Sequence, residues 1–277
     1  MKKYFLILLS VLTILSLTAC ETPETPPITT AVTTTATTTV VTTVPTTAVT
    51  TAVPTTAPTT EPTTAPTLPP HSPLYIPDVS VEDVIRFFNE VCLDAEYFST
   101  GNPELLQKWS DPIRYTLDGD CTDEDIATLT GFTDWLNTVE GFPGISQVQD
   151  TSEANLHIHF CTYDELTDIL GNQFIGADGG VTFWYDGFNS IYDATICIST
   201  EIDQTVRNSV ILEEVYNSLG PVQDTQLRED SIIYSGYSEP QCLTQMDMLI
   251  LNLLYHPEIK CGMTAEECEA VIRQLYY

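Results

Sequence analysis

The fold is decided by the stretch Ile211-Leu-Glu-Glu-Val-Tyr-Asn-Ser-Leu-Gly-Pro-Val-Gln-Asp224. It predicts the last turns of a long helix, about 203–219. The helix should end at Gly220, because glycine adopts the backbone conformation of a helix C-terminus without strain and Pro221 cannot continue a helix. Five polar residues lie on this helix and the turn after it: Glu213, Glu214, Asn217, Gln223 and Asp224. We expect the other elements to position these five side chains as a site.

In the segments around this helix, apolar residues recur with one of two spacings. Alternating apolar residues predict strands, and apolar residues three and four apart predict helices. Ser or Thr followed three residues later by an acid marks helix starts after positions 80, 122, 244 and 264. The first half of the predicted order is a helix from 81, a short helix at 103–109, a strand at 113–117, a helix from 123 to near 141 and a weak strand at 145–148. The second half is a strand at 155–161, a helix at 163–170, strands at 180–185 and 192–200, and then the long helix. This order predicts an α+β fold, with a mixed β-sheet of about five strands, helices packed on it and a helical C-terminal tail.

The polar spacing of the central stretch resembles that of the zincin metallopeptidases. Those enzymes hold zinc with two histidines one helical turn apart, and the Glu between them is the general base. The stretch Glu213-Glu214-x-x-Asn217-x-x-Gly220-x-x-Gln223-Asp224 keeps the long form of this spacing but contains no histidine. The resemblance implies a zincin-like sheet with an edge strand at 180–185. It also implies a turn below the site at Ser231-Ile-Ile-Tyr234 and a following helix that begins with Leu243-Thr-x-x-Asp247.

Over roughly residues 110–265 the chain is similar to an uncharacterised family of domains of unknown function in predicted bacterial lipoproteins. Its members read Glu-Glu-x-x-Gln-x-Leu-Gly-x-x-Asn-Asp, then Ser-Ile-Phe, Leu-Tyr-(Asp)-Pro and a terminal Gly-Met. The matching residues here are Glu213-Glu214, Asn217, Leu219-Gly220, Gln223-Asp224, Ser231-Ile232, Leu254-Tyr255, Pro257 and Gly262-Met263. Asn217 replaces Gln and Gln223 replaces Asn, so both positions keep an uncharged amide. The family has no established activity to transfer.

The central motif is chemically unsuited to zinc. Zinc prefers thiolate and imidazole ligands, whereas this motif offers the carboxylate of Glu213 and two neutral amides. We therefore expect no metal and no other cofactor. Asn217 and Gln223 are expected to hydrogen-bond the carboxylates in a polar network that joins the helix to its turn. Alternatively, Glu214 is the general base of a divergent hydrolase, either metal-free or with a hard cation at Glu213 and Asp224.

A second candidate cluster lies on the strands predicted at 155–161 and 192–200. His157, His159 and Cys161 share one strand face, and Cys197 joins them if the two strands are neighbours. Two imidazoles and two sulfurs make an acceptable tetrahedral zinc site. The alternatives are a Cys161–Cys197 disulfide, or two partly buried thiols beside ordinary strand histidines.

The N-terminus predicts export and lipidation. Residues 1–20 combine Lys2 and Lys3 with a short apolar run and end in Leu17-Thr-Ala-Cys20, which resembles the lipobox of bacterial lipoproteins. That resemblance implies cleavage before Cys20 and acylation of its sulfur, so Cys20 would anchor the chain to membrane lipid. Residues 21–70 contain 23 Thr and 10 Pro, a composition that predicts a disordered linker. Residues 71–277 remain for the folded domain.

The charge and cysteine content of residues 71–277 restrict the partners. This part has 36 acidic and seven basic residues, a formal net charge of −29, which argues against nucleic acid and anionic polymers as direct partners. Its seven cysteines are an odd number, so at least one should stay free while others form disulfides outside the cytoplasm.

Together these observations predict a lipoprotein attached to the cell membrane, with its acidic domain on the extracytoplasmic side. We expect the zincin-like domain to be a pseudo-metallopeptidase. It would bind a peptide or another envelope component, or act through its structure alone. The alternative is the divergent hydrolase based on Glu214.

Overall fold

The computed structural model describes residues 72–93 and 105–277. The predicted signal peptide, the lipidation site at Cys20 and the Thr/Pro-rich linker lie outside the described residues, as do the first two positions of the short helix predicted at 103–109.

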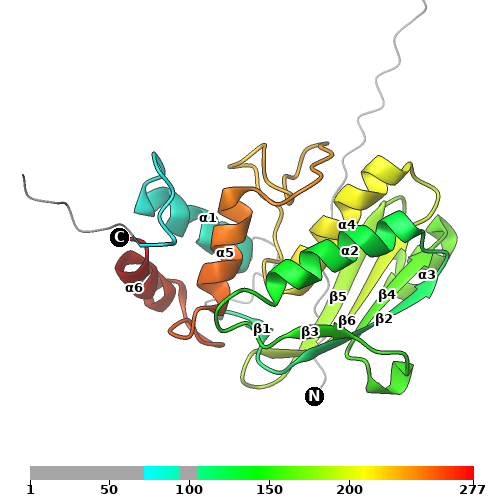
Figure 1. Cartoon of the computed structure of the whole chain (residues 1–277), viewed down its shortest axis with the longest axis horizontal. Helices are drawn as coiled ribbons and strands as arrows, with labels where there is room; N and C mark the ends of the chain where they lie inside the picture. Colours follow the sequence, from blue (N-terminus) through cyan, green and yellow to red (C-terminus); the bar gives the residue numbers. More distant parts are fainter. Residues whose placement is uncertain (1–71, 94–104) are drawn as a thin grey trace, which may run out of the picture. The chain divides into compact units, whose positions relative to one another are not determined.

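Six strands form one mostly parallel sheet in the order β1-β6-β4-β2-β3, with β5 also paired to β6 (Figure 1). The strands are β1 (Lys108–Trp109), β2 (Ile113–Gly119), β3 (Ile145–Gln147), β4 (Leu156–Cys161), β5 (Gly179–Tyr185) and β6 (Ser190–Ser199). Among the strands of the described residues, only the β5–β6 pairing is antiparallel. The mixed sheet of the predicted α+β fold is therefore confirmed, with six strands instead of about five.

β1 corrects the helix predicted at 103–109. Lys108 and Trp109 pair in parallel with Ser190 and Ile191, and residues 105–107 are not helical. Because this pairing joins residues about 80 positions apart, local hydrophobic spacing carries no signal of it.

The six helices begin where the sequence predicts. They are α1 (Val81–Leu93), α2 (Asp123–Leu136), α3 (Tyr163–Leu170), α4 (Gln204–Ser218), α5 (Gln245–Tyr255) and α6 (Ala265–Leu275). Thr122, Thr244 and Thr264 each form a capping box with the acid three residues on, as expected. α2 ends at Leu136, before the predicted end near Gly141.

The two faces of the sheet are covered by different helices. α2 and α4 lie side by side over one face (Figure 1), where Ile158 of β4 and Ile196 of β6 belong to the main core. The residues at the alternate positions of β4 and β6 point to the other face. There Cys161 and Cys197 form a smaller apolar cluster with α3 residues such as Leu166. Alternation along each strand thus separates the core beneath α4 from the cluster beneath α3.

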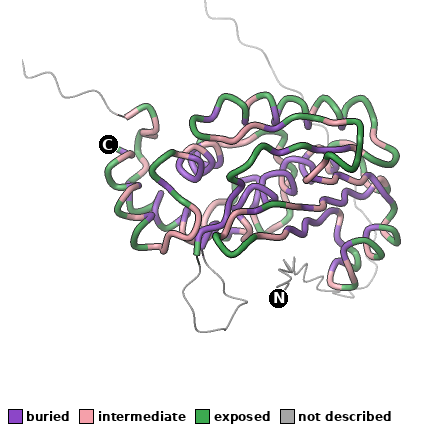
Figure 2. Tube along the Cα trace, turned by 90° about the horizontal axis from the view of Figure 1, so that it is seen from below, coloured by how far each residue is buried: buried purple, intermediate pink, exposed green. Residues whose placement is uncertain are grey.

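Buried residues lie in the interior of the Cα trace, and exposed residues lie along its outer turns (Figure 2). α1 packs against α5 and α6. Within the described ranges, no helix is long and apolar enough to cross a membrane.

Candidate functional site

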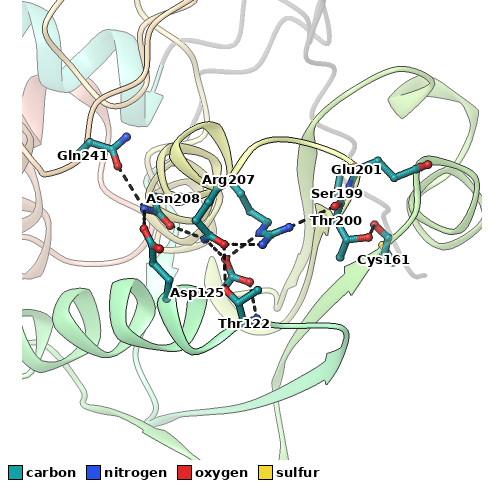
Figure 3. Close-up of polar contacts among 11 residues, drawn as sticks. Thr122, Asp125, Cys161, Ser199, Thr200, Glu201, Arg207, Asn208 and Gln241 are labelled. Carbon is teal, nitrogen blue, oxygen red and sulfur yellow. Dashed lines mark hydrogen bonds and ion pairs between the residues drawn. The ribbon is translucent and has the colours of Figure 1, made fainter.

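The N-terminal half of α4 is held by a buried ion pair with α2. Arg207 Nε donates to Asp125 Oδ1 over 2.9 Å, and Asp125 is completely buried (Figure 3). Gln204 Nε2 donates to the same oxygen over 2.6 Å, and Arg207 also donates to the carbonyl of Thr200 over 3.3 Å. This arrangement replaces a side-chain N-cap, which Asp203 does not provide.

The C-terminal end of α4 is fixed by aromatic donors and a glycine. Trp109 Nε1 donates to the carbonyl of Ser218 over 2.9 Å, and the Tyr255 hydroxyl donates to the carbonyl of Leu219 over 2.8 Å. These bonds satisfy carbonyls that a helix end leaves without partners. Gly220 follows with φ +134°, and a Cβ there would lie 2.6 Å from the Gln107 carbonyl oxygen. Only glycine fits this turn without strain.

The segment after the turn is anchored by Ser231. Ser231 Oγ donates to Asp247 Oδ1 over 2.6 Å, and both residues are fully buried. Asp247 is also the capping acid of α5, and its backbone carbonyl accepts a bond of 3.1 Å from the Tyr216 hydroxyl. The Ser-Ile and Leu-Thr-x-x-Asp motifs therefore join the turn, α5 and α4 in one buried polar connection.

The five predicted site residues lie on α4 and the turn, but they do not bond to one another. Glu214 is 3% exposed and Asn217 is 2% exposed, whereas Glu213, Gln223 and Asp224 are half-buried. Among the residues that the structure describes, Asn217 Oδ1 has no hydrogen-bond partner, although it is buried.

The prediction that these residues form a polar network among themselves is therefore wrong. A Cβ at Gly179 of β5 would lie 3.1 Å from Glu214 Oε1, so the Glu214 carboxyl lies against the sheet instead of toward its neighbours on the helix.

The environment of the three acids favours their protonated forms. Burial, with a smaller effect of Asp224, raises the pKa of Glu214 to about 8. Burial also raises the pKa of Asp224 to about 6, and burial followed by the charges of Glu214 and Asp224 raises that of Glu213. Unpaired carboxyl groups in a low-dielectric environment behave in this way, because desolvation disfavours the charged form. At neutral pH, Glu214 is therefore mainly a neutral carboxylic acid.

A family model described as "Protein of unknown function (DUF2927)" matches residues 81–274. The chain belongs to the DUF2927 family. The match covers α1 through nearly all of α6, so α4 and the turn after it lie within the family domain. No curated protein matches the chain.

The second predicted cluster of the DUF2927 domain is only partly assembled. His157 Nδ1 lies 3.4 Å from Thr116 Oγ1, and His159 Nδ1 lies 3.4 Å from Asp118 Oδ2. Across residues 72–93 and 105–277, no three His, Cys, Asp or Glu side chains are arranged to hold a metal ion. The zinc alternative on these strands thus gains no support from the geometry. Sequence reasoning missed Asp118, because a single acid at the end of a strand resembles an ordinary turn residue.

The cysteines of the DUF2927 domain are all thiols in this structure. Cys92, Cys161, Cys197 and Cys268 are buried, Cys121 and Cys261 are half-buried, and Cys242 is exposed. Cys161 and Cys197 belong to one apolar cluster, so the close approach expected of them is present without a bond between their sulfurs.

Replacing Glu214 by glutamine should change how the stability of the domain depends on pH. The folded pKa of about 8 exceeds the unfolded value of about 4.3. The stabilisation from protonated Glu214 is therefore complete below the unfolded pKa and is lost as pH rises through the folded pKa. Glu214→Gln should become progressively more stable relative to wild type between pH 5 and 9, by on the order of a few kcal/mol.

Urea unfolding at pH 5, 7 and 9 measures this difference. The matched control is Glu258→Gln, because the Glu258 side chain is exposed. The control should stay within about 0.5 kcal/mol of wild type at each pH. A Glu214→Gln difference that does not change with pH would show that Glu214 is ionised throughout.

Proposed function

We propose that the chain is a lipoprotein anchored through Cys20, with its DUF2927 domain on the extracytoplasmic side. The support is the Lys2-Lys3 start, the short apolar run and the Leu-x-Ala-Cys sequence at 17–20. Two or more acyl chains on one protein give stable anchoring, since each buried methylene contributes about 0.8 kcal/mol. The Thr/Pro-rich segment at 21–70 then serves as the spacer between membrane and domain.

The anchoring proposal is tested by Cys20→Ser in a bacterial host that processes lipoproteins. Wild-type protein should enter the detergent phase of a membrane extract and incorporate labelled fatty acid. Cys20→Ser should be recovered unlabelled in the aqueous phase. Labelling of both proteins would place the lipid on another residue, and labelling of neither would exclude lipidation.

We infer that the domain itself has a zincin-like fold. Three features support this inference. Within the described residues, β5 pairs only with β6 and is antiparallel to it, so it corresponds to the edge strand that the resemblance implies at 180–185. α4 packs on β5, and Glu214 lies against Gly179 at the start of that strand. The Ser231–Asp247 bond also fits the turn and helix that the resemblance implies below the site.

The domain binds a peptide or another envelope component without cleaving it. The burial of Glu214 carries this conclusion. A general base must reach the water that it activates. Glu214 is 3% exposed and its carboxyl lies against Gly179 of β5, so it does not meet this condition. Asn217, at the position of the second zinc ligand, presents a neutral amide in place of an imidazole.

Fluorescently labelled casein is a suitable probe of this conclusion. Wild type and Glu214→Gln should both leave casein uncleaved at pH 7, with and without added Zn²⁺, while retaining labelled fragments from a casein digest on the immobilised protein. Casein cleavage that disappears in folded Glu214→Gln would overturn the binding function. Metal analysis that finds one tightly held zinc per chain, lost in Glu213→Ala, would also overturn it.

A second candidate, a hydrolase using a hard cation, is favoured by one observation. Glu213 and Asp224 are half-buried carboxyl groups, and the buried Asn217 Oδ1 has no hydrogen-bond partner in the described part of the chain. Oxygen ligands suit Ca²⁺ and Mg²⁺. Titration with Ca²⁺ distinguishes the two candidates: binding accompanied by proton release and by casein cleavage supports the hydrolase.

A further inference from the structure

A cavity of about 210 Å³ lies beside α3, where β2 and β4 end. It is outside the α4 site, because its strand residues His159 and Cys161 point away from the core beneath α4. In sheets of parallel strands, ligands commonly bind outside the carboxyl ends of the strands. The cavity thus combines a common ligand position with a thiol in its wall.

The Cys161 thiol has a second thiol directly behind it. In the β4–β6 register, Cys197 is opposite His159, and Cys161 is two residues farther along the same face. Cys161 is 8% exposed and lines the cavity, whereas Cys197 is completely buried. A hydrogen bond with Cys197 lowers the pKa of Cys161 and raises that of Cys197. The accessible thiol is therefore the one that ionises more easily.

The surroundings hold the two thiols in place. Leu166, Leu170 and Phe174 pack against them in one apolar cluster. The Cys161 carbonyl accepts a bond of 2.8 Å from the Thr200 amide, and the Thr200 carbonyl accepts from Arg207 (Figure 3). The end of β4 is thus connected to the buried Arg207–Asp125 pair.

We propose that Cys161 and Cys197 form a reactive dithiol site that takes small cationic disulfides from this cavity. Cys161 is the attacking thiol, and Cys197 is the resolving thiol. The substrate charge follows from the cavity wall, where among the described residues Asp118, Glu165 and Asp168 outnumber the one basic side chain, His159, whose Nδ1 lies 3.4 Å from Asp118 Oδ2. Hydrogen bonds from Thr162 lower the pKa of Glu165, so its carboxylate stays ionised.

The reaction has two balanced steps. The Cys161 thiolate attacks one sulfur of the disulfide, forming a mixed disulfide and releasing a thiolate, which takes a proton from water. Cys197 then loses its proton to water and attacks the Cys161 sulfur as a thiolate, and the second thiolate that is released takes up a proton. The substrate disulfide is reduced to two thiols, while the two cysteines are oxidised to one disulfide.

The experiment uses the reduced full-length chain in detergent at low salt. Three probes are compared: cystamine, which is cationic, hydroxyethyl disulfide, which is neutral, and oxidised glutathione, which is anionic. Acid-quenched samples are analysed by peptide mapping with mass spectrometry. Cystamine should link Cys161 to Cys197 about tenfold faster than the neutral probe, and added salt should reduce this ratio. Oxidised glutathione should be the slowest of the three.

Variants separate the two roles and the source of the charge preference. Cys197→Ser should stop at a mixed disulfide on Cys161. Asp118→Asn combined with Asp168→Asn should bring the cystamine rate down to that of the neutral probe. Cys242→Ser, at an exposed thiol, should leave the Cys161–Cys197 reaction unchanged. Reaction at Cys242 or Cys121 while Cys161 stays reduced would overturn the proposal, as would a lasting mixed disulfide in wild type or equal rates for the three probes.

Discussion

Gly220→Ala is expected to lower the free energy of unfolding by about 3 kcal/mol or more. The φ of +134° is strained for any residue with a side chain, and such strain costs about 1–3 kcal/mol. The new Cβ would also lie 2.6 Å from the Gln107 carbonyl oxygen and 3.1 Å from Leu254 Cδ2. The Gln107 contact is with backbone, so relief requires moving either the end of α4 or the segment before β1. For a domain of this size the melting temperature should fall by about 6–12 °C.

Gly131→Ala is the matched control for this prediction. Gly131 is exposed in the interior of α2, and a Cβ there would meet nothing within 4 Å. Alanine in a helix interior is favoured over glycine, so this variant should be more stable than wild type by up to about 1 kcal/mol. Urea unfolding of the two variants gives the comparison. A Gly220→Ala variant as stable as wild type would show that the Gly220 turn can relax around a side chain.

The local elements of this chain were predictable because their signals are short-range. Thr122-x-x-Asp125 and Thr244-x-x-Asp247 mark helix starts through bonds between residues three apart, and both capping boxes form. β4 was predictable from alternation alone, because Leu156, Ile158 and Phe160 meet the core while the intervening residues face the other way. Gly220 was identified as the helix end for the same local reason.

The arrangement of the site was not predictable, because it depends on contacts between distant segments. Sequence spacing placed Glu214 and Asn217 one turn apart and suggested mutual hydrogen bonds. Glu214 instead lies against Gly179 of β5, and the buried Asn217 Oδ1 has no hydrogen-bond partner in the described part of the chain. Nothing in the spacing of α4 indicates which strand it covers. The same limit hid the pairing of β1 with β6 and the contact of His159 with Asp118.

The Arg207–Asp125 pair is the clearest case of a long-range contact with a large energetic effect. It joins residues 82 positions apart, and their side chains are 8% and 0% exposed. Burial alone would raise the pKa of Asp125, but hydrogen bonds from Thr122, Gln204 and Arg207 outweigh it and hold that pKa below its ordinary value. The pair therefore stabilises α2 against α4 above the unfolded pKa of Asp125. This contribution is lost as pH falls through the lower folded pKa.

Asp125→Ala should lower the free energy of unfolding at pH 7 by about 3–5 kcal/mol, because it leaves the Arg207 charge buried without its carboxylate. Arg207→Met should cost a similar amount for the converse reason. The double variant should cost less than the sum of the two by at least about 1 kcal/mol, since no unpaired charge remains. Glu82→Ala is the control: it breaks an exposed pair with Arg273 and should cost less than about 1 kcal/mol. Chemical unfolding of the four variants measures the coupling directly. Strict additivity of the two buried substitutions would mean that water, and not Asp125, compensates the Arg207 charge.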